Sequence, residues 1–125
     1  IVVGGGADLF NSYAQRGSLD THLNNLSALV ELLPMFSRLR MLRHWAGTCD
    51  MAYDVSPIVG KTPLENLYIS TGWGTGGYKA IPAGGDTLAW TIAHDRPHEL
   101  IRPFQLDRFA SGRLLDEGAA SGVAH

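Results

Sequence analysis

The sequence predicts an α+β (α/β) fold, an antiparallel β-ribbon with short helices, arranged around a glycine-rich loop at residues 70–83. Two observations carry this prediction. Short β-branched and aromatic runs precede the loop, as strands do, while Leu88 and Ile92 follow it at helical spacing. We therefore expect a strand, a loop and a helix in that order, with the helix over residues 86–94.

Length and composition are those of one globular domain with a modest core. The 125 residues are 45% hydrophobic and 18% charged, with a net charge of −2. The chain carries no excess of positive charge, so no nucleic-acid partner is expected. No apolar run is long enough to predict membrane insertion. A lone cysteine, Cys49, excludes an internal disulfide and permits a reducing compartment, and we expect a cytoplasmic protein.

The glycines at residues 4–6 only partly match a dinucleotide-binding fingerprint. That motif needs a further glycine where this chain has Leu9, and a helix directly behind it, whereas residues 10–18 have no helical period. We interpret residues 1–3 as the end of a strand and residues 10–18 as a loop. Because the chain opens on Ile1 in mid-strand, without the charged start of a signal peptide, we expect it to be a piece of a longer chain.

A core-facing helix of about three turns is predicted before residue 34. Its apolar residues recur at helical spacing: Leu26, Leu29, Val30 and Leu33. Asp20 or Thr21 is available as the N-cap. Pro34 ends this helix and can begin a second short one over residues 34–39.

An antiparallel ribbon is predicted in the middle of the chain. Alternating side chains indicate a strand over residues 40–52, weakened at Gly47. Turn chemistry at residues 53–57 leads to a second strand at residues 58–60, and another turn leads to a third at residues 67–70. The third strand would deliver the chain into the glycine loop.

The glycine loop itself is the candidate binding site. Glycine lets backbone N–H groups approach a ligand closely, and a helix that begins just beyond would point its positive dipole end at that ligand. Lys79 adds a charge that could hold a carboxylate or phosphate. It follows Tyr78 and precedes Ala80, so the loop is not a phosphate-binding P-loop. The alternative is a flexible surface turn with a solvated lysine.

The C-terminal third carries a pair of histidines and an aromatic run. His94 and His98 are four residues apart, but Pro97 should end the helix before His98, so we predict a structural or solvated role and no metal site. Residues 100–109 should return over the core. Residues 116–125 are small and polar enough to fray.

Several motifs are similar to those of a known family. The runs at residues 43–47, 54–60 and 72–80 resemble the C-terminal part of FAD-dependent amine oxidases of the D-amino-acid oxidase superfamily. Residues 12–18, 91–98 and 104–125 resemble, within that superfamily, the beta subunits of heterotetrameric sarcosine oxidases. The resemblance implies that residues 1–125 are the C-terminal segment of such a catalytic subunit, without its Rossmann unit.

The resemblance also implies a reaction. Sarcosine, or a similar N-methyl amino acid, would pass a hydride from its methyl group to FAD, giving glycine, hydrogen peroxide, and formaldehyde or methylenetetrahydrofolate. FMN would take part in the full enzyme, and NAD and tetrahydrofolate would bind in partner subunits. The alpha, gamma and delta subunits would be the partners.

Site residues carry over from the family motif. Gly74, Thr75, Gly76 and Gly77 would line the isoalloxazine edge of FAD. Lys79 would lie with them at the cofactor and pair with the substrate carboxylate, a binding and orienting role without proton transfer. The resemblance implies no catalytic residue and no metal ligand in this segment.

The chain also departs from the family pattern. Val55 stands where relatives carry glycine, and Gly76 stands where monomeric relatives carry histidine. Those relatives attach flavin to a cysteine, but we expect Cys49 to be an unlinked, buried thiol. Because the Rossmann unit is missing, the isolated chain should be inactive and marginally stable or oligomeric. The alternatives are a folding or interaction module without catalysis, and the same fold acting on proline, dimethylglycine or another secondary amine.

Overall fold

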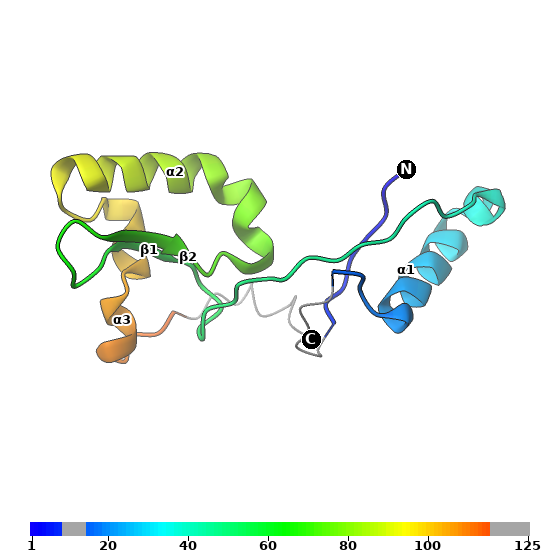
Figure 1. The fold of residues 1–125 in the computed structure, drawn as a ribbon, viewed down its shortest axis with the longest axis horizontal. Helices are drawn as coiled ribbons and strands as arrows, with labels where there is room; N and C mark the ends of the chain where they lie inside the picture. Colours follow the sequence, from blue (N-terminus) through cyan, green and yellow to red (C-terminus); the bar gives the residue numbers. More distant parts are fainter. Residues whose placement is uncertain (9–14, 116–125) are drawn as a thin grey trace. The chain divides into compact units, whose positions relative to one another are not determined.

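The structure is a computed structural model that describes residues 1–8 and 15–115, in two compact units, Ile1–Thr48 and Cys49–His125. Figure 1 shows helices in both units and a small two-stranded sheet in the second, which confirms the α+β class. The elements in chain order are α1 (Leu19–Leu32), η1 (Pro34–Arg38), β1 (Ile58–Lys61), β2 (Tyr68–Thr71), η2 (Gly74–Gly76), α2 (Gly77–His94), η3 (Glu99–Phe104) and α3 (Asp107–Ala110).

Helix α1 is the main element of the first unit. Its N-cap is Ser18, whose Oγ accepts the Thr21 N–H at 3.3 Å, so the predicted caps Asp20 and Thr21 were wrong by two or three positions. Pro34 ends α1 and begins the 3₁₀ helix η1, as predicted. No residue of α1 is buried, so its predicted core-facing side is not covered by the described residues.

The predicted strand over residues 40–52 is absent from the described structure. An alternating pattern forms a strand only where a partner offers a ladder of hydrogen bonds. Here the only β contact is a single bridge from Met51 to Trp73. Cys49, expected to be buried, is exposed. Residues 1–3, interpreted as the end of a strand, likewise have no strand partner within the described residues.

The β1–β2 hairpin was predicted correctly. The two strands are antiparallel, with Ile58 opposite Thr71 and Lys61 opposite Tyr68. Val59 on β1 is only 1% exposed and forms the centre of the small core. In the connecting turn Asn66 takes a φ of 59°, a conformation that asparagine tolerates better than most residues. The hairpin therefore delivers β2 directly into the glycine-rich segment.

Helix α2 begins at Gly77, nine positions earlier than the predicted start at Asp86. Low helix propensity at the intervening glycines and Pro82 argued against a helix there. Tertiary packing outweighs this low propensity, because Gly84 and Thr87 are buried on the inner face of α2. Its end at His94, ahead of Pro97, matches the prediction.

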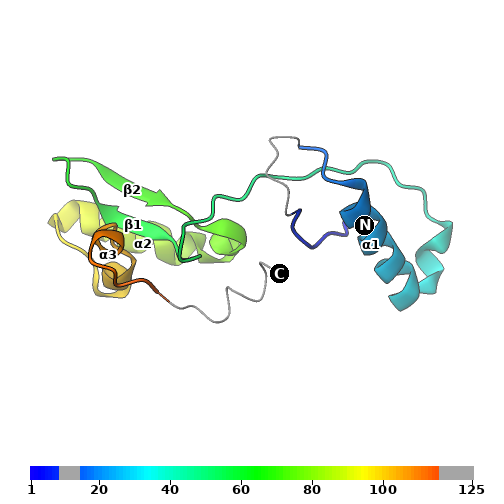
Figure 2. The ribbon, with the colours of Figure 1, turned by 90° about the horizontal axis from the view of Figure 1, so that it is seen from below.

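The segment from η3 to α3 returns over the hairpin, as predicted for residues 100–109. Figure 2 shows β1 lying between β2 and the helical elements α2 and α3. Ile101 is 5% exposed, and the side-chain amide of Gln105 donates to the Val59 carbonyl at 2.7 Å. Val59 and Ile101 are the buried apolar residues of the described chain, so the core is small. The predicted fraying of residues 116–125 lies outside the described residues, as does most of the predicted loop at residues 10–18.

Candidate functional site

The glycine segment, residues 72–77, connects β2 to α2. Gly72 and Gly74 take φ values of 70° and 53°, which glycine adopts without the steric penalty that other residues incur. A Cβ on Gly74 would also come within 2.5 Å of the Met51 sulfur. Glycine is therefore favoured at both positions by conformation, and a Cβ at Gly74 would also require the flexible Met51 side chain to shift.

Asp50 holds the start of the glycine segment. Its Oδ2 accepts the Gly72 N–H at 2.7 Å and the Thr71 hydroxyl at 3.3 Å, while its carbonyl accepts the Gly74 N–H at 3.1 Å. The Gly72 N–H is the main cause that lowers the pKa of the Asp50 carboxyl. Sequence reasoning placed Asp50 inside a strand and assigned it no role.

Trp73 fixes the segment against α2. Its indole N–H donates to Ser70 Oγ at 2.9 Å, and a Cβ on Gly84 would lie 2.8 Å from the ring. Beside the indole is a hollow of about 280 Å³. Its lining is mostly apolar or glycine: Ser70, Trp73, Gly77, Ile81, Gly84, Gly85 and Leu88. The glycine segment is therefore held on both sides and has open space next to it.

Lys79 lies in the first turn of α2, not in a loop as predicted. Its side chain is exposed, and it makes no ion pair with any part of the chain that the structure describes. Its Cε would lie 3.8 Å from a Cβ placed on Gly76, so the aliphatic stem runs beside the glycine segment. The structure thus brings Lys79 and the predicted glycines together at one helix end.

The first turn of α2 follows directly on η2 and presents the positive end of the helix dipole. Gly76 provides no side-chain cap, and the first turn holds no acidic residue. The exposed ammonium of Lys79 adds to the helix dipole at this end. Among the predicted cofactor-contacting residues, the Gly74 amide donates to Asp50 and the Gly76 amide donates to the Trp73 carbonyl at 3.1 Å. Those two N–H groups are therefore already used inside the protein.

The two histidines of the C-terminal third form no metal site with other ligands in the described residues. His94 stacks on Trp90 at 4.1 Å between ring centroids, and His98 meets the same indole edge-on at 5.1 Å. His98 Nδ1 accepts the Leu100 N–H, which caps η3. Both rings therefore contact Trp90, and the structural or solvated role stays a prediction.

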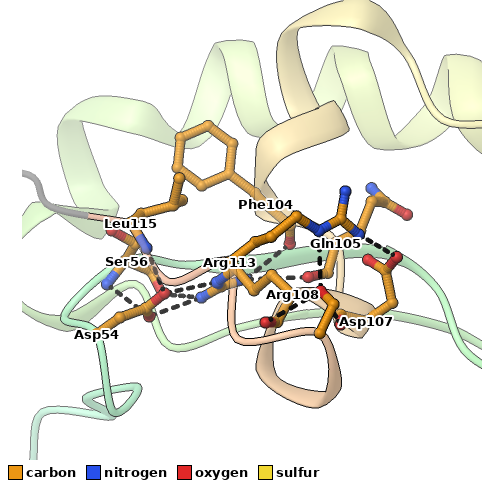
Figure 3. A network of polar contacts seen from close by, with 9 residues as sticks. Asp54, Ser56, Phe104, Gln105, Asp107, Arg108, Arg113 and Leu115 are labelled. Carbon is orange, nitrogen blue, oxygen red and sulfur yellow. Dashed lines mark hydrogen bonds and ion pairs between the residues drawn. The ribbon is translucent and has the colours of Figure 1, made fainter.

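A buried ion pair that sequence reasoning missed holds the second unit together. Figure 3 shows the Arg108 guanidinium facing the Asp54 carboxylate, with Nε–Oδ2 and Nη2–Oδ1 distances of 2.6 and 2.8 Å. The remaining guanidinium hydrogens reach the carbonyls of Ser56, Phe104 and Gln105. Asp54 was noted only as part of a turn and of the family-like run at residues 54–60, and nothing in the sequence linked it to an arginine 54 residues away.

A glycine segment that leads into an uncapped helix, with an unpaired lysine beside it, is an arrangement that enzymes use to bind an anionic group of a substrate or cofactor. The chain belongs to the FAD dependent oxidoreductase family, which matches residues 1–90. The uncapped helix end, the acid-free first turn and the free ammonium fit the electron-accepting ring of that cofactor.

Similar curated proteins are beta subunits of sarcosine oxidase. The chain is 49% identical over 125 residues to sarcosine oxidase subunit beta of Arthrobacter sp, covering 100% of this chain and 31% of that protein. It is 47% identical over 125 residues to the Rhodobacter capsulatus subunit, covering 100% of this chain and 30% of that protein. It is 46% identical over 117 residues to the Rhizobium meliloti subunit, covering 94% and 28%. The chain thus spans about a third of the length of these relatives.

Across the described residues, no helix combines the length and the apolar content that crossing a membrane requires.

Proposed function

We propose that residues 1–125 are the C-terminal segment of the FAD-binding catalytic subunit of a sarcosine oxidase. The full enzyme oxidatively demethylates sarcosine to glycine and forms hydrogen peroxide with formaldehyde or methylenetetrahydrofolate. Bound FAD supplies the hydride acceptor. The observation that carries the proposal is Lys79, which is exposed in the first turn of α2 beside the glycine segment and has no ion-pair partner among the described residues. The similar relatives of the chain are sarcosine oxidase beta subunits.

Lys79 binds the carboxylate of the amino-acid substrate in this proposal. An ammonium group at a helix N-terminus favours an anion through its own charge and through the dipole. Carboxylate binding orients the N-methyl group but moves no proton. Selectivity for amino acids over simple amines follows, because a substrate without a carboxylate leaves Lys79 unused.

The glycine segment would line the isoalloxazine edge of bound FAD. Because the Gly74 and Gly76 amides donate inside the protein, these glycines act mainly by leaving room for the ring. Thr75 and Gly77 complete the segment. With FAD bound, the positive end of the α2 dipole would favour negative charge on the ring.

The proposal includes the partners expected of a heterotetramer. The alpha, gamma and delta subunits would complete the enzyme, with FMN in the assembly and with NAD and tetrahydrofolate bound by partner subunits. The compartment is the cytoplasm. The name of the relatives, subunit beta, supports a multi-subunit enzyme.

The test is Lys79→Met in the full-length, assembled enzyme. Loss of one charge-assisted contact should raise the apparent KM for sarcosine by at least roughly tenfold, while FAD content stays the same. Lys61→Met is the matched control. Lys61 is on β1, and its ammonium already pairs with the Asp95 carboxylate, with Nζ 2.7 Å from Oδ1. Unchanged sarcosine kinetics in Lys79→Met would overturn the assignment. Faster oxidation of proline or dimethylglycine than of sarcosine by the wild-type enzyme would change the substrate while keeping the site.

A further inference from the structure

We propose that Asp50 is a positioning residue that fixes the glycine segment and, through it, Lys79. The inference rests on the proposed function, since Lys79 is the residue whose position matters. Asp50 touches neither the substrate nor the cofactor in this account. It acts at the other end of the segment, where β2 ends.

Asp50 binds the turn through both its side-chain carboxylate and its backbone carbonyl. Its carboxylate accepts from Gly72 at 2.7 Å and from the Thr71 hydroxyl, and its carbonyl accepts from Gly74 at 3.1 Å. Gly72 and Gly74 are the positive-φ residues of the segment, so they have the widest choice of backbone conformations. By accepting hydrogen bonds from both glycine N–H groups and from the Thr71 hydroxyl, Asp50 selects one of those conformations.

The backbone beyond the turn transmits this choice to Lys79. Beyond Gly74, both Gly76 and Gly77 have helical angles, with φ values of −88° and −58°, and η2 continues into α2 without a break. A helical backbone is stiff compared with a glycine turn, so the direction set at Gly72 and Gly74 also sets the direction of the first turn of α2. Lys79 is two residues into that turn.

The Asp50 carboxylate has no competing cation. It forms no ion pair with the residues that the structure describes, and it accepts hydrogen bonds from the Gly72 N–H and the Thr71 hydroxyl. Hydrogen bonds to an ionised acceptor are stronger than those to a neutral one. The exposed Asp50 carboxylate therefore stabilises the backbone conformation at the start of the glycine segment.

Hydrogen exchange measured by mass spectrometry on the full-length enzyme tests the hydrogen bonds between Asp50 and the glycine segment independently of activity. Asp50→Ala should speed exchange in peptides that contain Gly72 by roughly tenfold or more, the loss expected for a charge-assisted bond. Asp50→Asn keeps an oxygen acceptor of the same shape and should restore most of the protection. Asp107→Ala is the matched control, because Asp107 is another exposed aspartate, paired with Arg113 in the η3–α3 region.

Kinetics test the link to Lys79. Asp50→Ala should raise the apparent KM for sarcosine more than it lowers kcat, with FAD content retained, and should have no further effect in a Lys79→Met background. Additive effects in the double variant would overturn the positioning role, as would unchanged Gly72 exchange in Asp50→Ala. If the wild-type enzyme does not oxidise sarcosine, the proposed function fails, and the exchange experiment alone decides whether Asp50 fixes the segment.

Discussion

Arg108 and Asp54 form a bidentate ion pair in which both side chains are only 2% exposed. The five N–H hydrogens of the guanidinium all find acceptors, two on Asp54 and three on backbone carbonyls. A charge buried this deeply is tolerated only with such complete pairing. The pair therefore ties the turn before β1 to α3.

Arg108→Lys should destabilise the second unit by about 3 kcal/mol, because lysine keeps the charge but lacks the planar five-donor fork. Urea unfolding followed by tryptophan fluorescence measures the change. Arg113→Lys is the control, since its pair with Asp107 is 70% and 67% exposed and should matter by no more than about 0.5 kcal/mol. Equal effects of the two substitutions would contradict the role given to Arg108.

The Asp54 carboxyl makes stability depend on acid pH. Hydrogen bonds from Arg108 lower its pKa from 3.8 to about 2, so the ionised form is favoured in the folded state. The resulting stability, on the order of 2 kcal/mol, is fully present above the ordinary pKa and is lost as pH falls towards 2. Unfolding free energies of wild type and Asp54→Asn between pH 5 and 2 should converge as pH falls. Parallel pH profiles for the two proteins would contradict the assignment.

The predictable parts of this fold are those with local causes. Turn residues and a β-branched run locate the hairpin, and Pro97 locates the end of α2. The start of α2 was missed because Gly77 and Pro82 have poor helix propensity, which packing at Gly84 overrides. The prediction of a strand over residues 40–52 was wrong because alternation of side chains along one segment does not supply a partner strand to pair with it.

The site residues likewise divide into those close together in sequence and those brought together only by folding. The cluster of glycines and Lys79 is contiguous in sequence, so its proximity was predictable, whereas its role remains a prediction. Asp50 and Arg108 act over separations of 22 and 54 residues. No local spacing rule connects such pairs, so only the folded chain reveals them.

Val55 has a φ of 61°, a strained conformation for a β-branched residue. Val55→Gly should remove the clash with its Cβ and stabilise the second unit by about 1 kcal/mol, despite the extra freedom that glycine gains on unfolding. Val55→Ala retains a Cβ and should gain much less. If thermal unfolding shows equal gains for both, side-chain truncation and not backbone strain is the cause.

Two adjacent glycines of α2 should respond in opposite directions. A Cβ on Gly84 would lie 2.8 Å from the Trp73 ring, whereas one on Gly85 meets nothing within 4 Å. Gly84→Ala should cost about 1–3 kcal/mol and shift Trp73 fluorescence, and Gly85→Ala should stabilise α2 by about 0.5–1 kcal/mol. Similar effects at both positions would mean that Trp73 does not pack against α2 in this way.

The central claim is that Lys79 recognises a carboxylate, and carboxylate discrimination measures it most directly. The assembled enzyme and its Lys79→Met variant are compared on sarcosine and on dimethylamine, which has an N-methyl group but no carboxylate. We predict that the kcat/KM ratio of sarcosine to dimethylamine falls by at least roughly tenfold in Lys79→Met, with dimethylamine oxidation little changed. An unchanged ratio would contradict the account.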